Sequence, residues 1–171
     1  MTTSTLVPAT AMLVFAFAMI YAGLTDLTSN KIRNSVIVLL LLAYAALAPF
    51  AGFPMYEIGW SAAVALGVLL AAFVMFALGV IGGGDAKLAA VTALWFGADH
   101  TLAYLIYTML LGGALALAIL LFRMLPLPAR LENGSWIARL HARRGAMPYG
   151  VAMAAAALIV FPATPWMATI V

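Results

Sequence analysis

Charged residues are scarce in this sequence. They make up 8% of its 171 residues, whereas hydrophobic residues make up 67%. Soluble domains carry about 25% charged residues, and a water-soluble fold could not bury so much apolar surface. The composition therefore excludes an ordinary soluble domain and predicts a protein whose solvent is the lipid bilayer.

Cysteine is absent altogether, and only two histidines occur, His100 and His141. Without cysteine there are no disulfides, thiol nucleophiles, thiolate metal sites or iron–sulfur clusters. The two histidines fall in predicted loops on opposite sides of the membrane, so they cannot share a metal ion. We therefore expect no zinc peptidase site, and neither a metal nor another cofactor.

Apolar runs separated by short polar stretches fill most of the chain. A helix needs about 20 mostly apolar residues to cross the hydrocarbon core, and in lipid its backbone groups must be paired internally. The sequence predicts an all-α polytopic membrane protein, a single membrane domain (1–171) with six transmembrane helices. Their approximate ranges are 6–24, 35–53, 58–81, 86–98, 101–122 and 147–161, with a basic cytoplasmic loop at 123–146.

The basic residues all fall on one side of the membrane if six helices cross. Because Lys and Arg concentrate in short cytoplasmic loops, this arrangement places both termini outside the cytoplasm. If the short run 86–98 were instead a re-entrant hairpin, the loop arginines would move to the other side, which agrees less well with the charge rule. The residues on the basic side are Lys31, Arg33, Lys87, Arg123, Arg130, Arg139, Arg143 and Arg144.

The net charge of +3 follows from these loops and does not require a nucleic-acid partner. The basic segment 123–144 is interrupted by Pro126, Pro128, Glu132 and Gly134 rather than forming a continuous basic helix. We therefore expect this segment to contact lipid headgroups and not nucleic acid.

Two of the five acidic residues, Asp26 and Asp85, are predicted to lie at the membrane edge. The other three, Glu57, Asp99 and Glu132, fall in loops, where a solvated surface role is expected. In the six-helix arrangement Asp26 and Asp85 lie at the same, cytoplasmic edge. Ionisable groups at that depth usually face a bundle interior or an aqueous cavity and are functional.

Each of these aspartates also has a structural interpretation. Asp85 follows three glycines and opens a helix, so it could cap that helix by accepting backbone N–H groups, with Lys87 reaching the headgroups. Asp26 could cap a short turn or pair with Lys31 or Arg33. Taken singly, the two aspartates do not distinguish structure from function.

The surroundings of Asp85 favour the functional interpretation. From Asp85 to Ala98 the fourth run covers about 21 Å, whereas the hydrocarbon core is about 30 Å thick. If the outer end of this helix reaches the outer interface, Asp85 lies below the inner surface of the membrane. Gly82, Gly83 and Gly84 remove three side chains next to it, which allows close approach of another backbone. An extended substrate could lie beside this carboxylate.

A pair of carboxyls supplies both functions that amide hydrolysis needs without a metal ion or a serine or cysteine nucleophile. The ionised carboxyl draws a proton from water, and the protonated one polarises the carbonyl group. Mutual repulsion and partial burial make the two carboxyls differ, so identical residues acquire opposite roles.

Three motifs carry a resemblance to a known family. They are Asp26 followed by KIRN at 31–34, GGGDAKL at 82–88, and PYG at 148–150. In this order and at this spacing the chain resembles the type IV prepilin peptidases, aspartic proteases with a GxGD motif. It is most similar to the short form associated with tight-adherence (Flp) pili.

The resemblance implies that Asp26 and Asp85 are the catalytic pair of an aspartic endopeptidase acting in pilus biogenesis. Such an enzyme is a multi-pass protein of the bacterial cytoplasmic (inner) membrane and cuts the leader peptide from prepilins or pseudopilins at the cytoplasmic face. Longer members carry a cysteine-bearing insertion and also N-methylate the new terminus, so this chain is expected to be a peptidase alone. Family members often have proline where Arg33 stands.

Other residues have weaker assignments. Lys87 either holds the carboxyl of Asp85 ionised or attracts the substrate's carboxylate, and the alternative is a position at the headgroups. Asn34 is expected to cap the second helix. Within the segment 148–150, helix initiation and close packing are expected to dominate, and Tyr149 is the member most able to reach a bound peptide.

Two other functions remain possible from the residues alone. A small transporter or proton-coupled membrane component could use Asp26 and Asp85 as proton carriers, although both lie at one edge rather than along a path. A non-catalytic membrane scaffold would need neither carboxyl.

Overall fold

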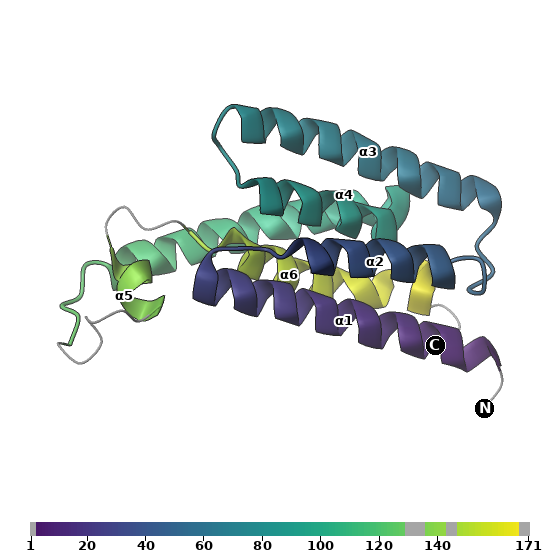
Figure 1. Ribbon diagram of the computed structural model, residues 1–171, viewed down its shortest axis with the longest axis horizontal. Coiled ribbons are helices and arrows are strands. Elements are labelled where there is room, and N and C mark those ends of the chain that lie inside the picture. The colour runs from purple at the N-terminus through teal and green to yellow at the C-terminus, as the bar shows by residue number, and fades with distance from the viewer. Residues whose placement is uncertain (1–2, 129–135, 143–146, 168–171) are drawn as a thin grey trace.

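The computed structural model describes residues 3–128, 136–142 and 147–167, and its regular structure there is entirely helical. Figure 1 shows the long helices side by side in a bundle. Five residues of the predicted basic loop lie outside the described residues, namely Arg130, Glu132, Gly134, Arg143 and Arg144. The helices are α1 (Thr3–Ser29), α2 (Asn34–Leu47), α3 (Met55–Ala77), α4 (Gly83–Phe122), α5 (Trp136–His141) and α6 (Tyr149–Val160), followed by the 3-10 turns η2 (Phe161–Ala163) and η3 (Pro165–Met167).

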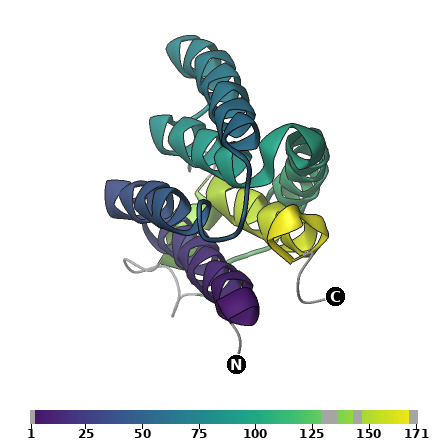
Figure 2. The same ribbon diagram turned by 90° about the vertical axis from the view of Figure 1, so that its right-hand side faces the viewer.

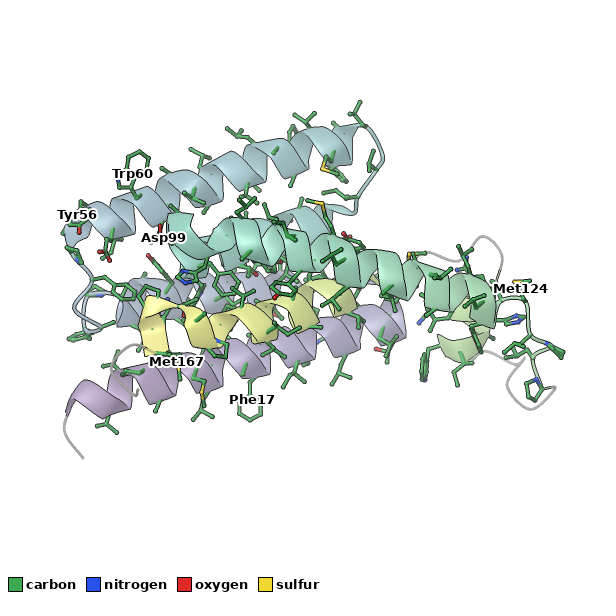
Figure 3. The ribbon with its side chains drawn as sticks, turned by 180° about the vertical axis from the view of Figure 1, so that it is seen from behind. Phe17, Tyr56, Trp60, Asp99, Met124 and Met167 are labelled. Atoms are coloured by element: carbon green, nitrogen blue, oxygen red, sulfur yellow. The ribbon has the colours of Figure 1, made fainter. Side chains whose placement is uncertain are left out.

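Three helices in the described ranges are long and apolar enough to cross a membrane, namely α1 from Leu6 onward, α3 and α4. The helices α2 and α6 are apolar but shorter. Large apolar side chains cover the outside of the bundle; Phe17, for example, is 69% exposed and points away from it (Figure 3). The all-α prediction is confirmed, and the apolar exterior fits a multi-pass membrane protein.

The first helix is longer than the apolar run predicts. It continues past Leu24 to Ser29, so Asp26 lies inside α1 rather than just beyond it. The hydroxyls of Thr25, Thr28 and Ser29 donate hydrogen bonds to backbone carbonyls three or four residues earlier, so these polar residues stay within the helix. The carboxylate of Asp26 is therefore held on a rigid element.

The helix α4 reverses direction at Gly97. This residue has φ 62° and ψ −166°, a conformation that is essentially restricted to glycine. Figures 1 and 2 show the two halves of α4, residues 83–96 (the first arm) and 98–122 (the second arm), running side by side in opposite directions. The reversal was expected at Asp99 and His100, which instead lie in the second arm.

The two arms differ in length, and this difference places Asp85 below the end of the bundle. At 1.5 Å per residue the first arm is about 21 Å long and the second about 37 Å. Both begin at the Gly97 turn, so the first arm ends about 16 Å short of the second. Asp85, in the first turn of the first arm, is therefore recessed relative to Arg123.

An aromatic cluster fixes the bundle at the end that contains the Gly97 turn. The rings of Phe15 and Phe161 stack with their centroids 4.4 Å apart, and those of Trp95 and Trp166 are 4.7 Å apart. The indole N–H of Trp95 donates to the carbonyl of Leu40 at 3.1 Å, and that of Trp166 donates to the carbonyl of Trp95 at 2.8 Å. Side chains from α1, α2, α4 and the two C-terminal 3-10 turns therefore pack together at this end. Both aspartates lie toward the opposite end of the bundle.

Candidate active site

Asp26 is buried between α1 and the start of α6. Its side chain is only 6% exposed, and its Oδ2 accepts a hydrogen bond from the backbone N–H of Gly150 at 2.7 Å. The N–H belongs to the first turn of α6, where backbone donors have no partner within the helix. One oxygen of Asp26 is thereby fixed in position.

Gly150 is the residue that makes this approach possible. A Cβ added there would lie 2.9 Å from Oδ2, 3.0 Å from Cβ and 3.1 Å from Cγ of Asp26. A second close contact lies one helical turn away, where a Cβ on Gly23 would be 3.2 Å from that of Ala154. The two helices therefore meet through small residues at the level of the carboxylate.

Asp85 is partly buried in the first turn of α4. Its Oδ2 accepts a hydrogen bond from the backbone N–H of Gly82, the N-cap residue, at 3.2 Å, which is one half of a capping box because glycine has no side chain to complete it. The capping interpretation therefore describes part of what this side chain does. Asp85 also lines a cavity of about 330 Å³ between α3, α4 and α6, so its carboxylate borders open space.

The segment between α1 and α2 packs against the start of α4, in the neighbourhood of both aspartates. The carboxylates of Asp26 and Asp85 are close enough to interact through their charges. A Cβ on Gly84 would lie 3.1 Å from the Cβ of Ile32, in the short segment between α1 and α2. Two acidic residues that are far apart in the sequence thus lie near each other at one end of the bundle.

The three glycines before Asp85 are packed by the protein itself. A Cβ on Gly83 would lie 3.3 Å from the ring of Phe76, and one on Gly82 would lie 2.9 Å from the carboxylate of Asp85. Together with the contact of Gly84 with Ile32, these distances show that a side chain at any of the three positions would force a neighbouring side chain to shift. The space for a ligand lies on the other side of Asp85, in the cavity.

The side chain of Lys87 contacts the start of α2. Its amine donates a hydrogen bond to the side-chain oxygen of Asn34 at 3.1 Å. Asn34 is the first residue of α2 and does not cap it; the cap position is Arg33, which makes no side-chain cap hydrogen bond. The prediction that Asn34 caps this helix is therefore wrong, because its amide is engaged by Lys87.

Lys87→Ala is expected to lower the free energy of unfolding by about 1 kcal/mol or less, because the hydrogen bond that it removes is exposed. Asn34→Ala should have the same effect, and the double variant should lose no more than either single one. Denaturant unfolding in detergent measures these values. Fully additive losses would contradict the contact.

Tyr149 lies on the wall of the cavity, next to the residue that binds Asp26. Its hydroxyl donates to the carbonyl of Thr108 at 3.4 Å. Its ring lies against Gly112 so closely that any side chain there would overlap it. The Tyr149 ring thus occupies the space that a side chain at Gly112 would fill. The sequence alone does not indicate this contact between Tyr149 and Gly112.

A cavity larger than the one beside Asp85 lies elsewhere among the described residues. It has a volume of about 410 Å³ and is lined mainly by aromatic residues together with Glu57 and Asp99. Figure 3 shows Tyr56, Trp60 and Asp99 at one end of the molecule and Met124 at the opposite end. This cavity contains neither Asp26 nor Asp85, so size alone does not identify the site.

A metal site does not emerge from the side chains. Within the described ranges, no three His, Asp or Glu residues are close enough to hold one ion together. His141 is instead engaged with the carbonyl of Leu125 at 2.7 Å.

Comparison with protein families connects this geometry with a known group. A model described as the type IV leader peptidase family matches residues 13–117, which is more than half of the chain. The protein belongs to the type IV leader peptidase family. Membership implies peptidase activity, and the matched range includes both Asp26 and Asp85 but ends before Tyr149 and Gly150. No curated protein and no solved structure matches the chain.

Proposed function

We propose that this type IV leader peptidase is an intramembrane aspartic endopeptidase that removes leader peptides from prepilins of the Flp type. The observation that carries the proposal is the meeting of Asp26 and Asp85 at one end of an apolar helical bundle, with a cavity beside Asp85. Family membership supports peptide hydrolysis, and the two carboxyls supply the chemistry.

The reaction needs one proton shared between the two carboxyls. The ionised carboxylate takes a proton from water, whose oxygen attacks the carbonyl carbon of the scissile bond, while the protonated carboxyl donates to the carbonyl oxygen. The tetrahedral intermediate then collapses, the C–N bond breaks, and a proton passes to the leaving amine. The N–H of Gly150 occupies one oxygen of Asp26, which leaves the other oxygen available for water.

We further propose that the bundle crosses the bacterial inner membrane six times, with the two arms of α4 as separate crossings. The end that carries Lys31, Arg33, Lys87 and Arg123 then faces the cytoplasm, following the bias of basic residues. Both termini lie on the opposite side. Cleavage takes place near the cytoplasmic face, where the basic leader of a prepilin emerges from its apolar helix.

Co-expression with a candidate prepilin, in cells lacking other prepilin peptidases, tests this function. We expect the prepilin to shorten on a gel only when the protein is present. Mass spectrometry of the product should give a new N-terminus without an added methyl group. A prepilin that keeps its leader with every candidate would overturn the proposal, and a methylated terminus would overturn the absence of methyltransferase activity.

Purified protein in liposomes separates this function from a proton-coupled transporter. Cleavage should proceed without any ion gradient across the liposome membrane, because water is the only co-substrate. A strict requirement for a gradient would favour the transporter.

A further inference from the structure

The cavity beside Asp85 continues away from the carboxylate as a groove between α3 and the second arm of α4, which we call the α3–α4 groove. On α3 its wall includes Gly67, Ala71 and Met75. These residues are spaced four apart, so they form one stripe along the helix. From Gly67 to Met75 the stripe covers about 12 Å, or somewhat more than two helical turns.

The opposite wall comes from the second arm of α4 and includes Leu105 and Met109, which are again four residues apart. Hydroxyl groups of tyrosine and threonine are the other polar groups among the lining side chains, and the remainder of the lining is apolar. Met75 is near the end of α3 that leads to Asp85, whereas Gly67 lies in the middle of the helix. The groove therefore runs from the carboxylate into the apolar part of the bundle.

The groove is also open sideways. Figure 2 shows α3 at the edge of the bundle, and only 6% of its most apolar window is buried. Met75 is 43% exposed and Met109 is 63% exposed. A helix already in the bilayer could therefore enter the groove from the side, without passing through water.

We propose that the α3–α4 groove binds the apolar segment that directly follows the scissile bond of the substrate. This inference rests on the proposed function. A scissile bond held at Asp85 places the next residues along a groove that is apolar and runs inward, and the small residues Gly67 and Ala71 let a second helix approach closely. The volume of about 330 Å³ has room for a few side chains of that helix.

Gly67→Phe tests the groove with little risk to the fold. A Cβ at Gly67 meets no atom within 4 Å, so a larger side chain projects into open space. Gly59→Phe is the matched control, because Gly59 is on the same helix, has the same open space and does not line the groove. Ala71→Phe is a second variant that fills the same stripe.

Each variant is assayed on two substrates. One is the full-length prepilin; the other is a peptide with the same leader and scissile bond but without the apolar segment. We expect Gly67→Phe to lower kcat/KM for the prepilin about tenfold or more, mainly through KM, because at least one apolar side chain of the substrate is no longer buried. The value for the peptide should stay the same, and Gly59→Phe should change neither.

The possible outcomes separate the two proposals. Failure of the wild type on both substrates overturns the proposed function itself. Normal cleavage of the prepilin by both Gly67→Phe and Ala71→Phe overturns the groove assignment and leaves the space to a lipid acyl chain. An equal loss on both substrates also overturns it, because the groove would then serve catalysis and not the apolar segment.

Cross-linking gives a measurement that needs no turnover. A photoreactive residue is placed in the apolar segment, three residues after the scissile bond, and the prepilin is bound to the Asp85→Asn variant. We expect cross-links to α3 and to the second arm of α4. Cross-links confined to α1 and α2 would place the segment on another face and overturn the proposal.

Discussion

Asp26→Asn and Asp85→Asn are each expected to lower the rate of prepilin cleavage by about 10²–10⁴-fold or more, the contribution of one general acid or base. An amide can neither take a proton from water nor donate one as a carboxylic acid does. The protein should still fold, since an amide oxygen can accept from Gly150 and Gly82 as the carboxylate does. Rates come from a gel time course with purified protein, and folding from the thermal midpoint.

The double variant Asp26→Asn with Asp85→Asn should be no slower than either single variant, because groups that act as a unit are not additive. Asp99→Asn is the matched control: it makes the same change in an exposed residue near the Gly97 turn, and its rate should equal the wild type. Undiminished cleavage by either of the first two variants would remove the catalytic assignment.

Gly150→Ala is expected to reduce kcat by about 10²-fold, the cost of displacing a catalytic group by roughly 1 Å. The added Cβ lies 2.9 Å from Oδ2 of Asp26 and 3.0 Å from its Cβ, so either the carboxylate rotates off the N–H or α6 moves. Overpacking of this kind also lowers the free energy of unfolding by about 1–3 kcal/mol. Steady-state kinetics and denaturant unfolding measure the two effects.

Gly113→Ala provides the comparison for this variant. It is the same substitution in a helix, at a residue whose added Cβ meets nothing within 4 Å. Because alanine favours a helix over glycine by about 1 kcal/mol, the control should be slightly more stable and fully active. Equal rates for Gly150→Ala and Gly113→Ala would show that the contact with Asp26 does not matter to the reaction.

Hydropathy alone predicted the all-helical fold, whereas the six crossings and the orientation inferred from charge stay predictions. The long apolar runs indicate the helices, and the motifs at Asp26 and Asp85 indicate a site at one end of the bundle. The end of α1 was missed because hydropathy counts Thr25 and Thr28 as polar, whereas in the structure their hydroxyls are satisfied by the helix itself. The reversal at Gly97 was missed because the nearby charge at Asp99 suggested a loop two residues too late.

The sequence predicted which carboxylates belong to the candidate site but not the backbone group that orients Asp26. A carboxylate can be recognised in a sequence, but the donor that orients Asp26 is a backbone N–H, which every residue except proline possesses. What selects Gly150 is the absence of a Cβ at a close contact between helices, and that requires knowledge of both partners. The pairing of Lys87 with Asn34 was missed for a similar reason, since 53 positions separate the two residues.

The hydrogen bond from Gly150 to Asp26 joins residues 124 positions apart, one in the first helix and the other in the last. During synthesis the chain therefore grows by 124 positions beyond Asp26 before this aspartate receives its partner. A nascent or truncated chain that ends before α6 lacks the group that orients Asp26, however well its earlier helices are inserted. On the proposed function, a chain without α6 is therefore expected to cleave more slowly than one in which α6 is in place.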